Sequence, residues 1–232
     1  MEGSQRIILF SDVHGNITGL RAVLDQATRL ENVTHIIGLG DYFGYGAGCN
    51  DIIELCQEKN VLLVRGGHEE ILNIIDAGQD GGRYMKEIYF THQWLKKNLK
   101  NKYYEMVTSL PFEVRLKLNE KYDLIGFHAT YRDMEANVCG TDRPLETLET
   151  AYGKLDENVV VYGHYHEPHV IPFRDKLLIN CASVGMRKND SMSNYTVIEY
   201  DREKIAIIQR QVEYDKAEED RLVEERGMLR RM

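Results

Sequence analysis

Near its start the sequence reads Arg6-Ile7-Ile8-Leu9-Phe10-Ser11-Asp12-Val13-His14-Gly15, an apolar run that passes directly into a carboxylate and an imidazole. A short continuous apolar run is typical of a strand that is buried on both faces. Apolar residues then recur at helical spacing from Leu20 to Leu30, and a second apolar run follows at 35–39. A helix at about 50–59 and a strand at 61–65 complete an alternation that predicts a parallel sheet, with functional loops at the carboxyl ends of its strands.

The sequence changes character beyond these segments. Residues 69–110 carry mostly helical signals, broken by the turn-forming segment at 78–82, and we interpret about 78–110 as a helical insertion. Further strands are predicted at 112–118, 123–128, 159–162 and 176–180, a hairpin at 195–200 and 204–212, and a charged helix at 215–231. Because repeats and low-complexity tracts are absent from the sequence, we interpret residues 1–232 as a single domain.

Composition excludes several classes of protein. The 37 acidic and 29 basic residues give a formal charge of −8, whereas proteins that coat nucleic acid need a basic surface. Every apolar run is far shorter than the ~20 residues of a membrane helix, and the first residues lack the basic region of a signal peptide. The cysteines are scattered, as reduced thiols usually are: Cys49, Cys56, Cys139 and Cys181. We therefore expect a cytoplasmic protein without an extended nucleic-acid surface or a membrane contact.

Histidine and aspartate residues follow five of the predicted strands, where the chain leaves the sheet. These strand ends carry, in order, Asp12 and His14, then Asp41, then His68 with Glu69, then His128, and finally His164 with His166. The carboxyl ends of strands in an open α/β sheet meet in one crevice. Each residue alone would more often be structural, but together they predict a metal site. The candidate ligands combine carboxylate with imidazole and suit Mn, Fe, Zn or Ni: Asp12, His14, Asp41, His128, His164 and His166.

A site of this composition has a definite chemistry. A carboxylate such as Asp41 can bridge two cations, and two metal ions roughly 3.5–4 Å apart hold both oxygens of an in-line displacement at phosphorus while they lower the pKa of a bound water. The resulting hydroxide is a nucleophile at neutral pH. His68 follows the neighbouring strand, where an imidazole could protonate the leaving oxygen or stabilise charge on the phosphoryl group. Its alternative role is to cap the helix that starts near Glu69.

These motifs resemble the signature of the calcineurin-like metallophosphoesterase superfamily. The resemblance covers almost the whole chain, and it rests on Asp12-Val13-His14-Gly15-Asn16, Gly40-Asp41, Gly66-Gly67-His68-Glu69, His128, Gly163-His164-Tyr165-His166 and the segment 180–185. The segment that contains Gly44 is similar to the small prokaryotic phosphoesterase branch. It differs from the Ser/Thr protein phosphatases, which have another Asp at this position. The resemblance implies an α/β (α+β) fold, a four-layer sandwich of two mixed β-sheets flanked by helices.

The resemblance also implies a role for each site residue. Asp12, His14 and His166 would hold one metal ion, His128 and His164 the other, with Asp41 as the bridge and His68 as the catalytic histidine. The family's Gly-Asn-His-Asp/Glu motif supplies an Asn ligand to the second metal, and this chain has Gly67 there. The affinity of the second of the two divalent metals should therefore be lower.

The implied function is hydrolysis of a phosphodiester, phosphoanhydride or phosphomonoester of a small molecule, such as a nucleotide, by a metal-bound hydroxide. Alternatives are a dinucleoside polyphosphate hydrolase or a protein phosphatase. The latter is the weaker choice because of Gly44 and the negative net charge. Gly67 leaves open a third alternative, a catalytically weakened metal-binding or interaction module.

Other residues are candidates for substrate contacts, although packing is their commoner role. Aromatic side chains of the insertion could stack on a nucleobase: Tyr84, Tyr89, His92, Trp94, Tyr103 and Tyr104. Arg65, Arg132 and Arg187 could contact a substrate phosphate. Asn180, Ser183 and His169 are expected to be structural.

Overall fold

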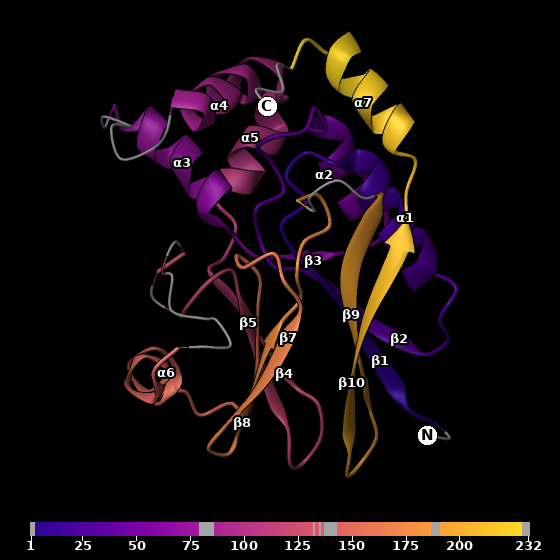
Figure 1. The fold of residues 1–232 in the computed structure, drawn as a ribbon, viewed down its shortest axis with the longest axis vertical. Coiled ribbons are helices and arrows are strands. Elements are labelled where there is room, and N and C mark those ends of the chain that lie inside the picture. Colours follow the sequence, from indigo (N-terminus) through magenta and orange to yellow (C-terminus); the bar gives the residue numbers. More distant parts are fainter. Residues whose placement is uncertain are drawn as a thin grey trace.

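The computed structural model describes residues 3–78, 86–131, 133, 134, 136, 143–186 and 191–228, with the side chains of 86–89 left aside. Two five-stranded mixed sheets lie side by side along the length of the molecule (Figure 1). The first sheet has the order β10-β9-β1-β2-β3 and contains β1 (Gln5–Phe10), β2 (Val33–Gly38), β3 (Leu62–Leu63), β9 (Met192–Tyr200) and β10 (Ile205–Glu213). The second has the order β4-β5-β6-β8-β7 and contains β4 (Glu113–Lys117), β5 (Asp123–Phe127), β6 (Val159–Tyr162), β7 (His169–Phe173) and β8 (Lys176–Asn180).

The pairing within each sheet combines parallel and antiparallel strands. β1, β2 and β3 are parallel neighbours, as the alternation of strands and helices predicts, and β9 and β10 add an antiparallel hairpin. β5, β6 and β8 are parallel, and β4 and β7 are antiparallel edge strands. The carboxyl ends of the parallel strands of both sheets therefore lie at the same end of the molecule (Figure 1).

Side chains alternate along β1 and build two separate apolar layers. Ile7 and Leu9 pack between the two sheets against Val159 and Val161 of β6. Ile8 and Phe10 face the opposite way, into the layer beneath the helices. These four residues of β1 are completely buried, as the continuous apolar run predicts.

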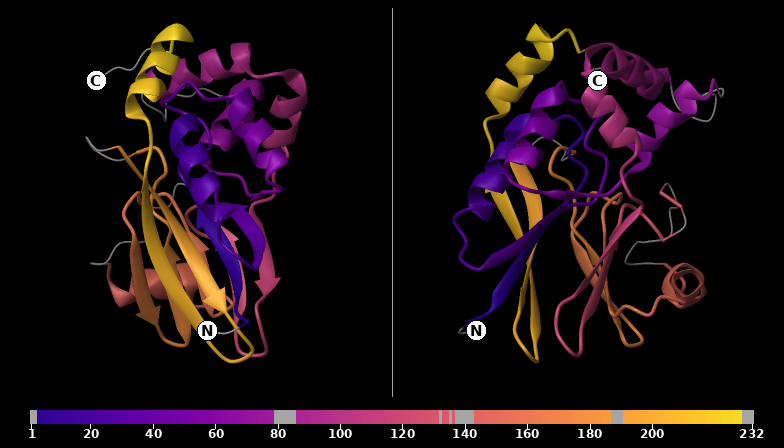
Figure 2. Two further views of the ribbon diagram at one scale, coloured as in Figure 1. Left: turned by 90° about the vertical axis from the view of Figure 1, so that its right-hand side faces the viewer. Right: turned by 180° about the vertical axis from the view of Figure 1, so that it is seen from behind.

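Helices cover both outer faces of this pair of sheets (Figure 2). The seven helices of the described residues are α1 (Ile17–Ala27), α2 (Asn50–Glu58), α3 (Gly67–Asp76), α4 (Lys86–Asn98), α5 (Asn101–Thr108), α6 (Leu145–Tyr152) and α7 (Lys216–Glu225). α1 and α2 pack on the first sheet, and α6 packs on the second through Leu148 and Tyr152. The order of layers is therefore helix, sheet, sheet, helix, as expected, while α3, α4 and α5 gather above the carboxyl ends of the strands (Figure 1).

Two elements escape the sequence patterns. β7 contains Pro172 and alternates exposed with partly buried residues, which is tolerated because β7 is an edge strand. α6 has only eight residues, too few for a clear helical period. Within the predicted insertion, the structure describes α4 and α5, while residues 79–85 lie outside the described part. None of the described helices combines the length and hydrophobicity needed to cross a bilayer, and Cys49, Cys56 and Cys181 are free thiols, Cys139 lying outside the description.

Replacement of Leu9 by Ala should lower the free energy of unfolding by about 2–5 kcal/mol, because it opens a cavity between the two sheets. Leu145→Ala is the matched control, because Leu145 is 69% exposed and its truncation creates no cavity. Urea unfolding monitored by circular dichroism measures both values. Equal losses in the two variants would contradict the packing described here.

Candidate metal centre

The predicted ligands leave their strands in an unusual backbone conformation. Five of the six have positive φ angles: Asp12 (55°), His14 (48°), Asp41 (54°), His164 (68°) and His166 (59°). Non-glycine residues seldom adopt this left-handed conformation, and where they cluster the strain is commonly tied to function. Backbone hydrogen bonds hold the turns in place, among them His14 N to Asp41 O at 3.0 Å, which joins the ends of β1 and β2.

Glycine permits the ends of the two sheets to come together. A Cβ atom at Gly163, after β6, would lie 1.9 Å from Ser11 Oγ and 2.5 Å from Asp12 Oδ2, after β1. Any side chain at this position would push β1 and β6 apart. The Gly163-His164 turn can therefore approach Asp12 closely, and His164 N donates to Asp12 Oδ2 at 2.9 Å.

Asp12, His14 and His166 form the first cluster of donor atoms, all within 4.8 Å of one another. His166 Nε2 lies 3.2 Å from Asp12 Oδ1 and 3.1 Å from His14 Nε2. Burial lowers the pKa of His14 to about 4. For His166, burial opposes the charged form, but the hydrogen bond and charge of Asp12 outweigh it and raise the pKa. Two imidazole nitrogens that face each other beside a carboxylate are suited to share a cation.

Asp12, Asp41 and His128 form a second cluster. His128 Nδ1 donates to Leu39 O at 2.8 Å, which leaves Nε2 as the ring nitrogen that faces the site. That nitrogen is buried without a hydrogen-bond partner, 3.2 Å from Asp41 Oδ2. Although burial disfavours the charged form, the Asp41 carboxylate raises the pKa of His128 to about 10. A metal cation would take the place of the proton that this carboxylate attracts.

His164 lies beside the second cluster. Its ring meets that of His128 edge to face, with centroids 5.4 Å apart. Burial lowers its pKa and so favours the neutral form that can bind metal. Among the described residues, the groups of three candidate ligands whose donor atoms lie within 4.8 Å of one another do not include His164.

His68 is the second residue of α3 and lies against both Asp41 and His14. Its backbone N–H donates to Asp41 Oδ1 at 2.8 Å, so the carboxylate of Asp41 caps this helix start. The imidazole meets that of His14 with centroids 4.9 Å apart, and Nε2 lies 3.9 Å from Asp41 Oδ2. Burial lowers the pKa of His68 to about 4, and its Nδ1 is buried without a hydrogen-bond partner. The ring is therefore a neutral imidazole directed at the site.

Glu69 organises the loops behind the site, a role that the sequence analysis missed. Its carboxylate is fully buried and accepts hydrogen bonds from three backbone N–H groups: Asp41 at 2.8 Å, Tyr42 at 2.9 Å and Gly66 at 2.9 Å. Burial and the charge of Asp41 raise the pKa of Glu69 to about 7. The available signal was a glutamate at the third position of a helix, which is typical of a capping box.

Gly44 and Tyr45 complete the wall beside His68. Gly44 has φ of 135°, and a Cβ atom there would lie 2.8 Å from His68 Cε1 and 3.2 Å from His14 Nδ1. A side chain at position 44, such as the Asp of the protein phosphatases, would collide with these rings. The half-buried Tyr45 lies 5.3 Å from His14 and 5.6 Å from His68 between ring centroids. The sequence patterns did not single out Tyr45.

Several other candidates are structural. Asn180 donates to Gly163 O, and Ser183 Oγ donates to Asp12 O at 2.8 Å, so both shape the loops of the site. Arg65 pairs with Glu70 at 3.1 Å and stacks on Phe112. Tyr103 is buried in the core beneath the helices, and Trp94 and Tyr104 pack against it. Tyr84, Arg132, Arg187 and the side chain of Tyr89 lie outside the described residues.

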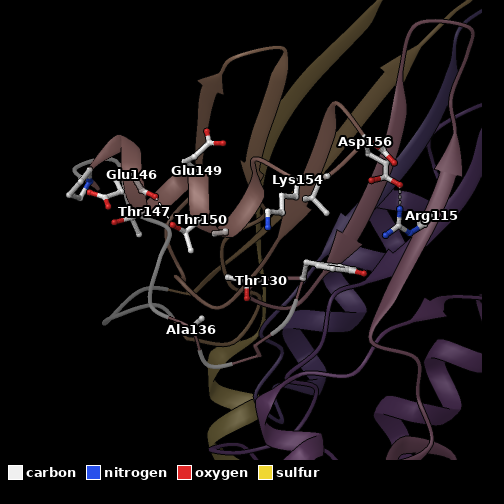
Figure 3. A pocket seen from close by; sticks show the side chains of 14 residues that line it. Arg115, Thr130, Ala136, Glu146, Thr147, Glu149, Thr150, Lys154 and Asp156 are labelled. Carbon is white, nitrogen blue, oxygen red and sulfur yellow. Dashed lines mark hydrogen bonds and ion pairs between the residues drawn. The ribbon is translucent and has the colours of Figure 1, made fainter.

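A cavity of about 1060 Å³ is lined by residues other than those of these clusters (Figure 3). Glu146, Thr147 and Glu149 of α6 line one side, and Arg115 and Asp156 line another. No predicted site residue is among its described lining residues. The candidate ligands therefore lie at the strand ends and do not line this cavity.

Comparisons with known proteins agree with this geometry. The sequence pattern of the calcineurin-like phosphoesterase superfamily domain matches residues 6–203. The protein MJ0912 of Methanocaldococcus jannaschii is 29% identical over 227 residues, which cover 90% of this chain and 88% of that protein. The crystal structure of PH1004 from Pyrococcus horikoshii superposes with a TM-score of 0.82 at 15% identity and covers 97% of this chain and 94% of that one. A metallophosphoesterase from Sphaerobacter thermophilus gives a TM-score of 0.71 at 22% identity, with 98% and 96% covered.

Glu69→Gln should lower the free energy of unfolding by about 1.5–3 kcal/mol, because an amide offers one oxygen to three converging N–H groups and leaves at least one of them unsatisfied. The apparent Mn²⁺ affinity should fall as the Asp41 turn loosens. Glu70→Gln is the control, because Glu70 makes a partly exposed ion pair with Arg65 and accepts from the Asn73 side chain, and it bonds none of the backbone N–H groups that Glu69 holds. Urea unfolding and calorimetric Mn²⁺ titration measure the two effects, and identical behaviour of the variants would argue against the anchoring role.

Proposed function

The chain belongs to the calcineurin-like phosphoesterase superfamily, and from this membership we propose that it is a metal-dependent hydrolase of phosphate esters or anhydrides of small molecules. The observation that carries the proposal is the convergence of carboxylate and imidazole donors from separate strand ends within 4.8 Å. Their burial would be costly without a cation to compensate it.

The donor set fits divalent transition metals such as Mn, Fe, Zn or Ni. The Nε2 of His128, which faces the Asp41 carboxylate, and the facing Nε2 atoms of His14 and His166 support this fit. We assign one ion to Asp12, His14 and His166 and a second to His128 and His164, with Asp41 shared between them. Bound ions would supply a coordinated water of lowered pKa and would withdraw charge from the phosphoryl oxygens.

The residues of the chain contribute orientation and proton placement. Asp41 is fixed on both sides, because its N–H donates to Glu69 and its carboxylate accepts from His68 N. His68 is neutral at physiological pH, since burial lowers its pKa to about 4. A neutral imidazole still carries one N–H, which would donate a hydrogen bond to the leaving oxygen as charge develops there. We therefore favour stabilisation of the leaving oxygen over full protonation as the role of His68.

Gly67 supports one alternative, a weakened metal-binding or interaction module. The position begins α3 and offers no side-chain oxygen to the second metal. Against this alternative, five of the six candidate ligands predicted from the sequence lie in groups of donor atoms within 4.8 Å, and His68 lies beside them in contact with His14. The substrate we propose is a small phosphorylated molecule, such as a nucleotide or dinucleoside polyphosphate, because the net charge of −8 disfavours acidic macromolecules.

Asp41→Asn should reduce turnover of an aryl phosphodiester or phosphomonoester in Mn²⁺ by at least about 100-fold, because changes to outer-shell partners alone cost 10–100-fold. Chelation of the metal should have the same effect on the unmodified protein. Asp25→Asn on the exposed face of α1 is the control and should keep full activity. Undiminished turnover by the metal-saturated Asp41 variant would rule out the proposed mechanism.

Gly67→Asn should raise both the affinity for the second metal equivalent and the turnover by several-fold, because it restores the amide oxygen of the family motif. Gly67→Ala controls for the backbone effect of any side chain at the start of the helix. Metal titration by calorimetry and steady-state kinetics give the two values. Tighter metal binding without turnover would favour the interaction module, and no change in either value would contradict the assignment of the missing ligand.

A further inference from the structure

A second buried histidine lies directly behind His68. His92 belongs to α4 and is completely buried. Its Nε2 donates to His68 O at 2.9 Å, while Nδ1 lies 3.4 Å from Thr91 Oγ1. The two imidazoles stack with centroids 5.1 Å apart and an interplanar angle of 29°. His92 therefore contacts both the backbone and the ring of His68.

The orientation of the His68 ring depends on packing contacts, because side-chain hydrogen bonds from the described residues do not fix it. Its Nδ1 has no hydrogen-bond partner, and its Nε2 is 3.9 Å from the nearest Asp41 oxygen. No side-chain hydrogen bond among the described residues therefore fixes the rotation of the ring. The ring is instead enclosed by Gly44, by Tyr45 and by the stacked ring of His92. Removal of His92 would open one face of this enclosure.

The helix that carries His92 is itself held firmly. Leu95 of α4 and Leu99, which follows the helix, are buried in the core beneath the helices, and Trp94 Nε1 donates to Arg226 O at 3.2 Å. α4 lies above the strand ends in the segment between β3 and β4 (Figure 1). A side chain on a fixed helix can hold its neighbour within the small tolerance that catalysis requires.

We propose that His92 is a positioning residue, which fixes the backbone of His68 by a hydrogen bond and the angle of its imidazole by stacking. The proposal rests on the proposed function, in which the N–H of His68 meets the leaving oxygen. In this arrangement the segment between β3 and β4 supplies a part of the reaction geometry and does more than cover the site. His92 itself is not among the groups of candidate ligands that the described residues form.

Three substitutions separate the two contacts of His92. His92→Gln keeps an N–H donor but removes the ring, His92→Phe keeps a ring but removes the donor, and His92→Ala removes both. His169→Gln is the matched control, because His169 is a partly buried histidine on β7. Its Nε2 lies 3.0 Å from Tyr162 Oη, and its hydrogen bond does not involve His68. Thermal unfolding and Mn²⁺ stoichiometry establish that each variant is folded and loaded.

The kinetic readout is the dependence of kcat on the leaving group, measured with nitrophenyl, chlorophenyl and unsubstituted phenyl esters of phosphate. His92→Ala should lower kcat on the phenyl ester by roughly 10–100-fold and on the nitrophenyl ester by less than about threefold, with unchanged KM, because only a poor leaving group needs the N–H of His68. The kcat values of the His92→Gln and His92→Phe variants should lie between those of His92→Ala and the parent protein. These two variants therefore test the proposal if His92→Ala fails to fold. An equal loss on all esters, or no loss, would overturn the proposal.

A second readout does not depend on turnover. NMR spectra of histidine rings, with the His68 signals assigned from a His68→Gln sample, should show that His92→Ala shifts or broadens those signals but leaves His128 unchanged. Unchanged His68 signals would overturn the positioning role even in an active enzyme. If the parent protein hydrolysed none of the esters, the proposed function would fail for these substrates, while the spectra would still decide the role of His92.

Discussion

The carboxylate of Glu69 is the interaction on which the site depends. It accepts hydrogen bonds from the N–H groups of Asp41, Tyr42 and Gly66, and so ties the turn after β2 to the start of α3. Asp41 in turn accepts from His68 N. A charge buried in this way is tolerated because three donors face it. Asp41 and the neighbouring His68 are consequently held together as one unit by these hydrogen bonds.

Local sequence signals predicted the parts of the fold in which burial dictates the pattern. The apolar run of β1 is buried on both faces, and the strand-end placement of Asp12 and His128 brought each of them to the crevice. The same reasoning could not foresee β7, because its Pro172 is acceptable only at an edge. Nor could it predict the partners of Glu69 or the stacking of His92 on His68, since these depend on contacts between segments far apart in the chain. The assignment of these residues to metal ions stays a prediction, for His164 as for the other candidate ligands.

Helix α7 supports the loops of the site, although it lies outside the region that matches the family pattern. α7 follows residue 203, where that match ends. Its Glu219 is buried and accepts from Thr18 N and Oγ1 near the start of α1. Arg226, just beyond the helix, donates to Ala47 O and pairs with Asp51 at 2.9 Å. This segment therefore supports the loop that carries Gly44 and Tyr45.

The left-handed conformation of the candidate ligands has a consequence for how the protein can change. Each such residue costs on the order of 1 kcal/mol, so five together cost about 5 kcal/mol, comparable to the whole net stability of many domains. Glycine would relieve this cost at His14 or His166 while removing a candidate ligand. Stability alone would therefore favour glycine at these positions, so the strain is what the fold bears in order to hold carboxylate and imidazole groups at the strand ends.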